Sequence, residues 1–404
     1  MQPFEYAQPT QVICETGAGV RAGAFASVLG RRVLVVTGEK SARASGALGH
    51  VEESLQAHDL PYELFEGVPP NPAVSVVDAG AAFARSVHTD VIIAVGGGSV
   101  IDAAKAIATV AVSHLSYRNY LSGIRTEQVY IESTLPVIAI PTLPGSGSET
   151  NGTSVIVDDI TGRKLSAHSE LAAPRVALLD ALYPARAPRR LLALGYADAL
   201  CHAIEAGLSQ RASIASDALA EVSISMLRRC ASTAIRRDLD AVATCMWASN
   251  LAGQALSLAG SILTHPLAHP LSARCGAHHG ATVAALEPVV LAALADSWGD
   301  SAPKLAGWFG SRATNPAAAM RAVLTRLAAF NKALGITATT RELGLAEDMI
   351  DTFVADARAS GSRGLANTAG RPLSHAAMAE IYERSLDANP SVAQRRLPGP
   401  VAAG

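Results

Sequence analysis

The chain has 404 residues, of which 49% are hydrophobic and 17% are charged. This balance supplies apolar material for large cores, and the length favours two domains over one. The formal net charge of −2 argues against a polyanionic partner such as nucleic acid. The five cysteines form no Cys-x-x-Cys pair, as is usual for reduced thiols in a cytosolic protein.

We expect a soluble, cytoplasmic protein that does not cross a membrane. The first residues, Met-Gln-Pro-Phe-Glu, lack the basic and apolar regions of a signal peptide. No apolar run reaches the roughly 20 residues that a bilayer-spanning helix needs.

Residues 1–185 alternate short apolar runs with alanine-rich stretches. Runs without polar alternation indicate strands covered on both faces, and therefore a parallel sheet. Such strands are predicted at 32–37, 90–95 and 136–140, with helices at 40–58, 74–87 and 100–113. This βαβ order predicts an open, Rossmann-like α/β sheet as the first domain.

From residue 186 onward, strand-like runs almost disappear and long helical patterns follow. Helices are predicted at 189–209, 213–232, 238–260, 281–297, 317–335, 346–357 and 374–386. The second domain, 186–404, is therefore predicted to be all-helical, with its boundary near residues 183–188.

Two glycine-rich turns follow predicted strands of the first domain. Residues 96–105, GGGSVIDAAK, open a helix, whose free amides attract phosphate while glycines allow close approach. Ser99 and Asp102 also fit a Ser-x-x-acid capping arrangement. Residues 141–149, PTLPGSGSE, offer hydroxyls beside glycines. Neither turn has the G-x-G-x-x-G fingerprint, and each is also compatible with an ordinary turn, but the carboxyl ends of parallel strands are where open α/β sheets bind ligands.

Four of the 11 histidines gather in one mostly apolar stretch, at positions 265, 269, 278 and 279. His265 and His269 are four residues apart, so they share a face if the segment is helical. A lone buried histidine is usually a core residue. His278 keeps that ordinary interpretation, because on a regular element it points away from whatever its neighbour His279 binds.

A second pair lies upstream, where Asp198 and His202 are again four residues apart on a strongly helical pattern. Together the two segments can supply one carboxylate and three imidazoles. Such a donor set suits a divalent first-row ion, and two separate pairs favour a metal site over a structural role.

Over nearly its whole length, the sequence resembles the iron-containing, or group III, alcohol dehydrogenase family. Lys164 and the Val-Ala-Leu-Leu-Asp ending at Asp180 fit the family pattern. The other matching segments are EGVPPNP at 66–72, GGGSVIDAAK at 96–105, PTLPGSGSE at 141–149, DALCHAIEA at 198–206, HxxxH followed after nine residues by HG at 265–280, and NTAGRPLS at 367–374.

The resemblance implies a dehydroquinate synthase-like fold, with a nicotinamide dinucleotide-binding α/β domain and a helical metal-binding and substrate domain. The implied metal, Fe²⁺ or Zn²⁺, has as ligands Asp198, His202, His265 and His279, while His269 matches a histidine assigned to proton relay. The implied cofactor-binding residues are Gly97, Gly98 and Ser99 at the pyrophosphate, Thr142, Leu143, Ser146 and Ser148 on the nicotinamide side, and Asp102 and Lys164 with less defined roles.

The activity implied is that of a metal-dependent, NAD(P)-linked alcohol dehydrogenase or aldehyde reductase. The ion acts as a Lewis acid on the substrate oxygen, hydride passes between substrate and nicotinamide, and His269 carries the proton. Family members commonly form homodimers or larger homo-oligomers. The sequence shows no arginine cluster near the expected pocket, which favours a short- or medium-chain alcohol, diol or aldehyde.

The turn after the strand at 32–37 bears on the choice of nicotinamide. Relatives that prefer NAD often carry an aspartate where this chain has Gly38. Lys40 and Ser41 can accept a 2′-phosphate, which favours NADP, although Glu39 can still serve as the missing acid.

Several alternatives remain. A glycerol dehydrogenase or a maleylacetate reductase uses the same scaffold, but the intact Asp-His-His-His set disfavours the latter. A dehydroquinate synthase-like sugar-phosphate cyclase normally needs a Glu, two His and many basic residues. A structural metal site is usually rich in cysteine, and no cysteine belongs to this set. Candidates to face the substrate are Asn151, Trp247 and Asn250, each equally compatible with packing or capping.

Overall fold

The structure is a computed structural model that describes residues 4–124, 129–360, 362–368 and 373–392. The chain forms two compact units. One, the N-terminal unit, comprises Ala7–Leu192 and Arg236–Asn250; the other, the helical unit, comprises Ala193–Ile235 and the chain from Leu251, together with the described residues up to Tyr6. The predicted division at 185/186 stays a prediction, because each unit is built from non-contiguous segments. The tail beyond residue 392 and positions 369–372 of the motif at 367–374 lie outside the described residues.

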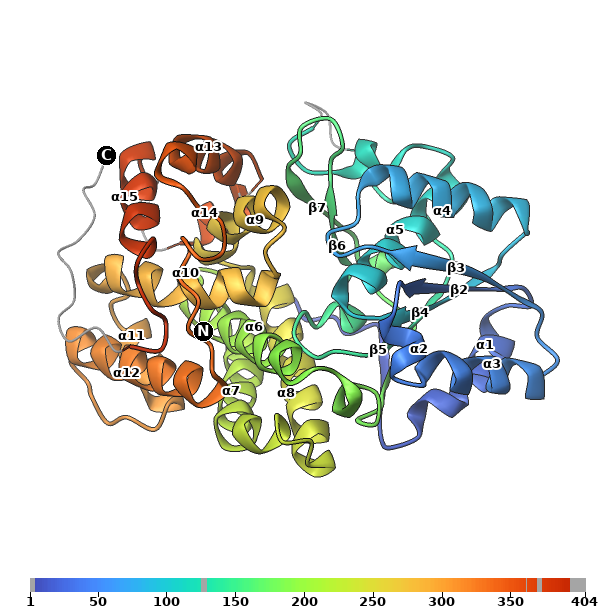
Figure 1. The fold of residues 1–404 in the computed structure, drawn as a ribbon, viewed down its shortest axis with the longest axis horizontal. Coiled ribbons are helices and arrows are strands. Elements are labelled where there is room, and N and C mark those ends of the chain that lie inside the picture. Colours follow the sequence, from blue (N-terminus) through green and yellow to red (C-terminus); the bar gives the residue numbers. More distant parts are fainter. Residues whose placement is uncertain (1–3, 125–128, 361, 369–372, 393–404) are drawn as a thin grey trace. The chain divides into compact units, whose positions relative to one another are not determined.

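A six-stranded, fully parallel sheet forms the centre of the N-terminal unit (Figure 1). The predicted strands at 32–37, 90–95 and 136–140 are confirmed as β2, β4 and β5, which lie inside the sheet. The strand order is β1-β8-β5-β4-β2-β3, with bounds β1 Gln11–Cys14, β2 Val33–Gly38, β3 Tyr62–Val68, β4 Val91–Gly96, β5 Val137–Pro141 and β8 Val176–Leu179.

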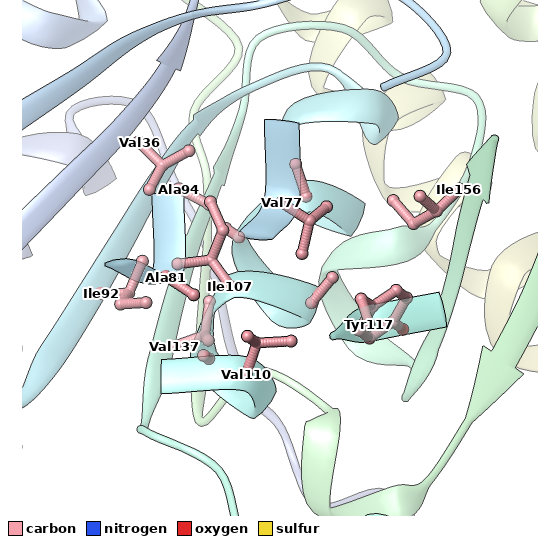
Figure 2. Close-up of a cluster of buried hydrophobic side chains, with 14 of the residues drawn as sticks. Val36, Val77, Ala81, Ile92, Ala94, Ile107, Val110, Tyr117, Val137 and Ile156 are labelled. Carbon is pink, nitrogen blue, oxygen red and sulfur yellow. The ribbon is translucent and has the colours of Figure 1, made fainter. Parts of the chain in front are cut away.

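Helices cover both faces of this sheet, which is why its inner strands read as continuous apolar runs. On one face lie α4 (Val74–Ser86) and α5 (Gly98–Ser113), and on the other α1 (Ala22–Leu29) and α3 (Ala47–Ala57). Successive residues of β2 alternate between the two cores: Val36 packs with α4 and α5, and Val35 packs with α1 and α3. Figure 2 shows the first core, where Val36 and Ile92 from the sheet face Ile107 of α5.

The predicted helix at 40–58 is instead two helices, α2 (Ser41–Ala44) and α3. Gly46 separates them with φ of +80°, a left-handed conformation that suits glycine and ends a helix. An antiparallel hairpin that the sequence patterns did not predict, β6 (Thr153–Val157) and β7 (Lys164–His168), follows the second glycine-rich turn. Its apolar residues Ile156 and Leu165 join the core under α5.

Beyond β8, the described residues contain no strand, as the sequence patterns predicted. The predicted helix at 281–297 starts earlier and ends at Ala293, where a short 3₁₀ turn follows. The helices of this half of the chain are α6 Arg189–Leu208, α7 Ile214–Ala234, α8 Leu239–Ala259, α9 Thr264–Cys275, α10 His279–Ala293, α11 Ser301–Trp308, α12 Pro316–Leu334, α13 Ile350–Ser360, α14 Ser362–Asn367 and α15 His375–Ser385.

By length and composition, α6 is apolar enough to cross a membrane, but 94% of its most apolar window is buried inside the structure. It therefore has the surroundings of a core helix, in which Asp198, His202 and Glu205 are enclosed by protein.

A fully buried lysine, Lys105, joins α5 to the second glycine-rich turn. Its Nζ donates to the Ser148 carbonyl at 3.1 Å and hydroxyl at 2.6 Å, and also to the carbonyl oxygen of Thr153. Asp102 lies 3.2 Å from the same nitrogen and balances its charge. Burial lowers the pKa of Lys105, and the neighbouring Asp102 carboxylate opposes that shift. The ammonium therefore holds residues 148–153 against α5.

Replacing this cation should destabilise the N-terminal unit. Lys105→Met leaves Asp102 without its counter-charge and removes the hydrogen bonds to the turn, so we expect a loss of about 3 kcal/mol in the free energy of unfolding. Chemical denaturation followed by circular dichroism measures it. The matched control Lys332→Met, at an exposed position of α12, should change stability by less than about 0.5 kcal/mol; equal effects of the two variants would contradict the anchoring role.

Candidate metal centre

Helix α6 presents two of the predicted ligands on one face. Asp198 and His202 are one turn apart, and Asp198 Oδ1 lies 3.8 Å from His202 Nε2. Only 6% and 4% of these residues are exposed. A buried carboxylate beside a buried imidazole is costly unless both groups find partners.

Helix α9, which starts at Thr264, supplies the third ligand, so the condition under which His265 and His269 share a face is met. Pro266 lies in its first turn, where a missing amide hydrogen costs nothing, and Gly276 ends the helix with φ of +65°. His265 Nε2 lies 3.0 Å from His202 Nε2, and the two rings stack with centroids 4.8 Å apart.

His279 is the first residue of α10, and its Nε2 lies 3.9 Å from Asp198 Oδ1. Its neighbour His278 caps the helix, because its Nδ1 accepts the amide hydrogen of Gly280 at 3.2 Å. His278 is exposed, so it is not the core residue that the ordinary interpretation expects; its ring caps the helix instead.

A glycine lets α10 approach α6 closely. A Cβ on Gly280 would lie 2.3 Å from the carbonyl oxygen of Leu194. This carbonyl is one turn before Asp198 on the same helix. The absent side chain at Gly280 therefore permits the contact that brings His279 to Asp198.

Together, α6, α9 and α10 bring all four predicted ligands into one cluster. Candidate ligand atoms of Asp198, His202 and His265 lie within 4.8 Å of one another, and the His265 and His279 rings are 5.3 Å apart. Oδ1 of Asp198 is buried and has no hydrogen-bond partner among the described residues. A hydrogen bond between the two Nε2 atoms needs a proton on one of them, whereas a cation between these donors satisfies both without one. The residues present thus fit a divalent ion.

His269 lies one turn after His265 on α9 and is half-buried. Its ring centroid is 6.3 Å from that of His265 and 5.7 Å from that of His279. The structure thus places it at the edge of the cluster, beside two of the predicted ligands. Its relay role stays a prediction.

Glu205 belongs to this cluster, although the sequence patterns did not single it out. It is fully buried on α6, and its Oε1 lies 2.5 Å from His265 Nδ1. Burial raises the pKa of Glu205 to about 8. Its position seven residues after Asp198 and three after His202 places it on the same helix face, and that spacing was the available signal.

The buried Cys201 is not among the described side chains whose ligand atoms lie close enough to share an ion with Asp198. Burial, reinforced by the neighbouring Glu287 and Glu205, raises the pKa of the Cys201 thiol well above its usual range. On α10, burial also raises the pKa of Glu287 far above the usual range of a carboxyl group.

In the N-terminal unit, the two glycine-rich turns lie at the carboxyl ends of parallel strands, as predicted, and these strands, β4 and β5, are neighbours. Gly96 at the end of β4 pairs in register with Pro141 at the end of β5, and the Thr142 amide donates to the Gly96 carbonyl at 3.0 Å. A Cβ on Gly98 would lie 2.5 Å from Ser146 Oγ, so the turns are in close contact. Their amides and hydroxyls share the carboxyl edge of the sheet, where parallel sheets bind ligands.

The predicted Ser99–Asp102 capping arrangement is wrong. Helix α5 starts at Gly98, after Gly97 in extended conformation and without a side-chain cap. Ser99 Oγ instead accepts the Asn71 amide hydrogen at 3.4 Å, and Asp102 accepts that of Val155 at 3.0 Å. Both side chains form hydrogen bonds with residues distant in the sequence, and a pattern of neighbouring residues cannot predict such contacts.

Other predicted cofactor residues also have partners inside the protein. The Ser148 hydroxyl is buried and donates to Asp102, and Lys164 donates to Asn71 Oδ1 at 2.9 Å. Leu143 is half-buried, and its Cβ lies 4.0 Å from the Cβ position of Gly97. The cofactor roles of these residues stay predictions.

The residues predicted to select the nicotinamide follow β2. Gly38 is its last residue, and a Cβ there would lie 3.3 Å from Val100 Cγ2. Glu39, Lys40 and Ser41 are exposed. Lys40, which can bind a phosphate, and the acidic Glu39 are therefore both accessible to solvent at this edge of the sheet.

Two of the three substrate candidates make internal contacts. Asn151 Nδ2 donates to the Gly147 carbonyl at 3.0 Å, and Asn250 Nδ2 donates to Glu149 Oε1 at 2.8 Å. Asn250 is fully buried, and Trp247 is half-buried.

The chain combines a parallel α/β unit that has paired glycine-rich turns with helices that bring one carboxylate and three imidazoles together. This combination is typical of metal-dependent dehydrogenases. The chain belongs to the iron-containing alcohol dehydrogenase family: the sequence profile for iron-containing alcohol dehydrogenase matches residues 9–181, and that for the family's C-terminal domain matches residues 192–386. It is therefore an oxidoreductase that acts on a CH–OH group.

Similar proteins and solved structures agree with this family. The chain is 34% identical to the probable alcohol dehydrogenase EutG of Salmonella typhimurium over 71% of this chain and 72% of that protein. It is 28% identical to NADH-dependent butanol dehydrogenase A of Clostridium acetobutylicum over 95% of this chain and 100% of that one. The crystal structure of an iron-containing alcohol dehydrogenase from Thermotoga maritima matches with a TM-score of 0.82 and 27% identity, covering 96% of this chain and 100% of that one.

Adding a methyl group at Gly280 should weaken metal binding. The new Cβ in Gly280→Ala meets the Leu194 carbonyl, so α10 must move away from α6 and carry His279 with it. We expect metal affinity to fall roughly tenfold, equivalent to about 1.4 kcal/mol, as measured by titration of the metal-free protein with Zn²⁺ against a competing chelator. Gly307→Ala is the matched control, since its Cβ has no neighbour within 4 Å; loss of affinity in that variant alone would refute the close-approach argument.

Proposed function

We propose that this alcohol dehydrogenase is a metal-dependent enzyme that prefers NADP over NAD and interconverts a short- or medium-chain alcohol or diol with its aldehyde. The observation that carries the proposal is the convergence of Asp198, His202, His265 and His279 in a buried cluster with a carboxylate oxygen that lacks a hydrogen-bond partner among the described residues. We place it in the cytoplasm as a homodimer or larger homo-oligomer, as is common in the family.

The four ligands would hold Fe²⁺ or Zn²⁺, which, when bound, supplies Lewis acid chemistry to the substrate oxygen. The nicotinamide, when bound, supplies or takes up the hydride. The protein's own task is to hold these groups and to manage the proton. His269 lies beside two ligand rings, and its imidazole would carry that proton.

The glycine-rich turns would hold the cofactor's phosphates. Gly97 and Gly98 lead into α5, a 16-residue helix whose first amides point out of its N-terminus. Ser146 of the second turn lies against Gly98. A pyrophosphate at this point therefore meets backbone amides and hydroxyls from both turns.

The NADP preference rests on the end of β2. Gly38 leaves no acidic side chain at the position that faces the ribose in NAD-preferring relatives, and Lys40 and Ser41 are exposed nearby. The butanol dehydrogenase relative is named as NADH-dependent, so the preference has to be decided by assay. A glycerol dehydrogenase or maleylacetate reductase on the same scaffold is the alternative, which a screen of glycerol, maleylacetate, primary alcohols and aldehydes distinguishes.

Activity should depend on one bound divalent ion. Treatment with a chelator should abolish alcohol-dependent NAD(P)H formation, and stoichiometric Fe²⁺ or Zn²⁺ should restore it. Asp198→Ala should lower kcat/KM by more than roughly 100-fold, above the effect usual for a residue that only supports a ligand. Asp300→Ala, an exposed aspartate before α11, serves as the control. Full activity of the metal-free enzyme would refute the metal-dependent mechanism.

The KM for NADP should be lower than that for NAD. Lys40→Ala should raise the KM for NADP by roughly tenfold, the loss of about 1.4 kcal/mol of binding, and leave the KM for NAD within about twofold. Steady-state kinetics with both cofactors measure this, with the exposed Lys332→Ala as the control. A lower KM for NAD in the unmodified enzyme would overturn the cofactor preference.

A further inference from the structure

We propose that Glu205 is the positioning residue of the metal centre: it fixes the ring orientation and tautomer of His265, and it ties the start of α9 to α6. The proposal rests on the metal site proposed above. It adds a residue that touches neither the substrate nor the ion and acts only through His265.

Both oxygens of Glu205 are occupied, each by a different part of the same segment. Oε1 contacts His265 Nδ1 at 2.5 Å, and Oε2 accepts the Ile262 amide hydrogen at 2.7 Å. Ile262 lies just before α9, and His265 lies in its first turn. The carboxylate thus holds both the backbone entering α9 and the side chain that α9 contributes.

The same helix carries two ligands and this carboxylate. Asp198, His202 and Glu205 are spaced at i, i+4 and i+7 on α6, so they share one face. The distance from Glu205 to His265 therefore sets the distance between the ligands of α6 and the ligand of α9. The 3.0 Å approach of the His202 and His265 Nε2 atoms agrees with this constraint.

The contact also selects the tautomer of His265. A cation bound to the ligands would favour the ionised form of Glu205. A carboxylate only accepts hydrogen bonds, so Nδ1 of His265 then carries the proton. Nε2 is then the nitrogen whose lone pair is available to an ion, and it is the nitrogen that faces His202. A carboxylate behind a ligand imidazole also raises its basicity and holds its plane.

A second buried carboxyl group nearby provides a matched control. Glu287 is fully buried on α10, and its carboxyl group lies beside the Thr264 side chain. It therefore shares the burial of Glu205 without its contact to His265. Substituting both residues separates an effect of the contact from a general effect of altering a buried carboxyl group.

The test compares Glu205→Gln and Glu205→Asp with Glu287→Gln in the full-length protein. Glutamine has one acceptor oxygen, so when Glu205→Gln accepts from the Ile262 amide, its NH2 group can only donate to His265 Nδ1, which leaves the proton on Nε2. Aspartate keeps the charge and is one methylene too short to reach both groups. The metal-free proteins are titrated with Co²⁺ against a competing chelator, and visible absorption reports the coordination geometry.

We expect both Glu205 variants to bind Co²⁺ roughly 10- to 100-fold more weakly, with altered absorption bands, and Glu287→Gln to bind within about twofold of the unmodified protein. Affinity and bands unchanged in both Glu205 variants would overturn the proposal. An equal loss in Glu287→Gln would overturn it as well, because the effect would then belong to burial alone.

Two further measurements keep the outcome decisive. If neither Glu205 variant folds, ¹⁵N NMR of the histidine-labelled unmodified protein loaded with Zn²⁺ still reads the tautomer, and a His265 ring that binds through Nδ1 would refute the positioning role. Asp198→Ala and His265→Ala test the metal site itself. If these variants bind Co²⁺ as the unmodified protein does, the metal site fails. If they do not bind it but Glu205→Gln does so normally, only the role of Glu205 fails.

Discussion

The metal centre depends on the burial of ionisable side chains along one face of an otherwise apolar helix. Asp198, His202 and Glu205 are all enclosed by protein on α6. Removing such groups from water costs several kcal/mol each unless hydrogen bonds or opposite charges replace the solvent. Glu205 contacts His265 and accepts a hydrogen bond from the Ile262 amide, whereas Asp198 Oδ1 has no hydrogen-bond donor among the described residues. A cation is a partner that suits this arrangement, so the burial that is costly for the ligands alone favours metal binding.

The two units form their candidate binding sites from different groups, backbone turns in one and side chains in the other. In the N-terminal unit, parallel register brings two backbone turns to the same sheet edge, and the buried Lys105 holds the second turn in place. In the helical unit, side chains from three helices meet, and their positions depend on helix spacing. At Gly98 and Gly280 alike, a missing Cβ permits the contact between segments. A binding site formed by backbone amides tolerates varied side chains, whereas a metal site formed by side-chain ligands does not.

These differences explain how much of the protein could be predicted from its sequence. The inner strands β2, β4 and β5 were recognisable because both of their faces are buried. The edge strand β3, which is only partly buried, and the short strand β8 of four residues were missed. The i,i+4 spacing of Asp198 and His202 predicted a shared face, and the structure confirms that they lie together. The Ser99–Asp102 cap was wrong because Asn71 and Val155, distant in sequence, take those side chains. Glu205 was missed because its partner is 60 residues away.

The donor set also bears on which metal the protein holds. One carboxylate and three imidazoles are ligands of intermediate softness, and for such a site the usual order of affinities places Zn²⁺ above Fe²⁺. The ligands alone therefore do not select iron, although the family is named for it. Selection must come from the geometry that the helices impose or from the supply of metal in the cell. Since the spacing of α6 and α9 is set by the two hydrogen bonds of Glu205, the residue that orients His265 is also the one through which the fold can impose a preferred coordination geometry.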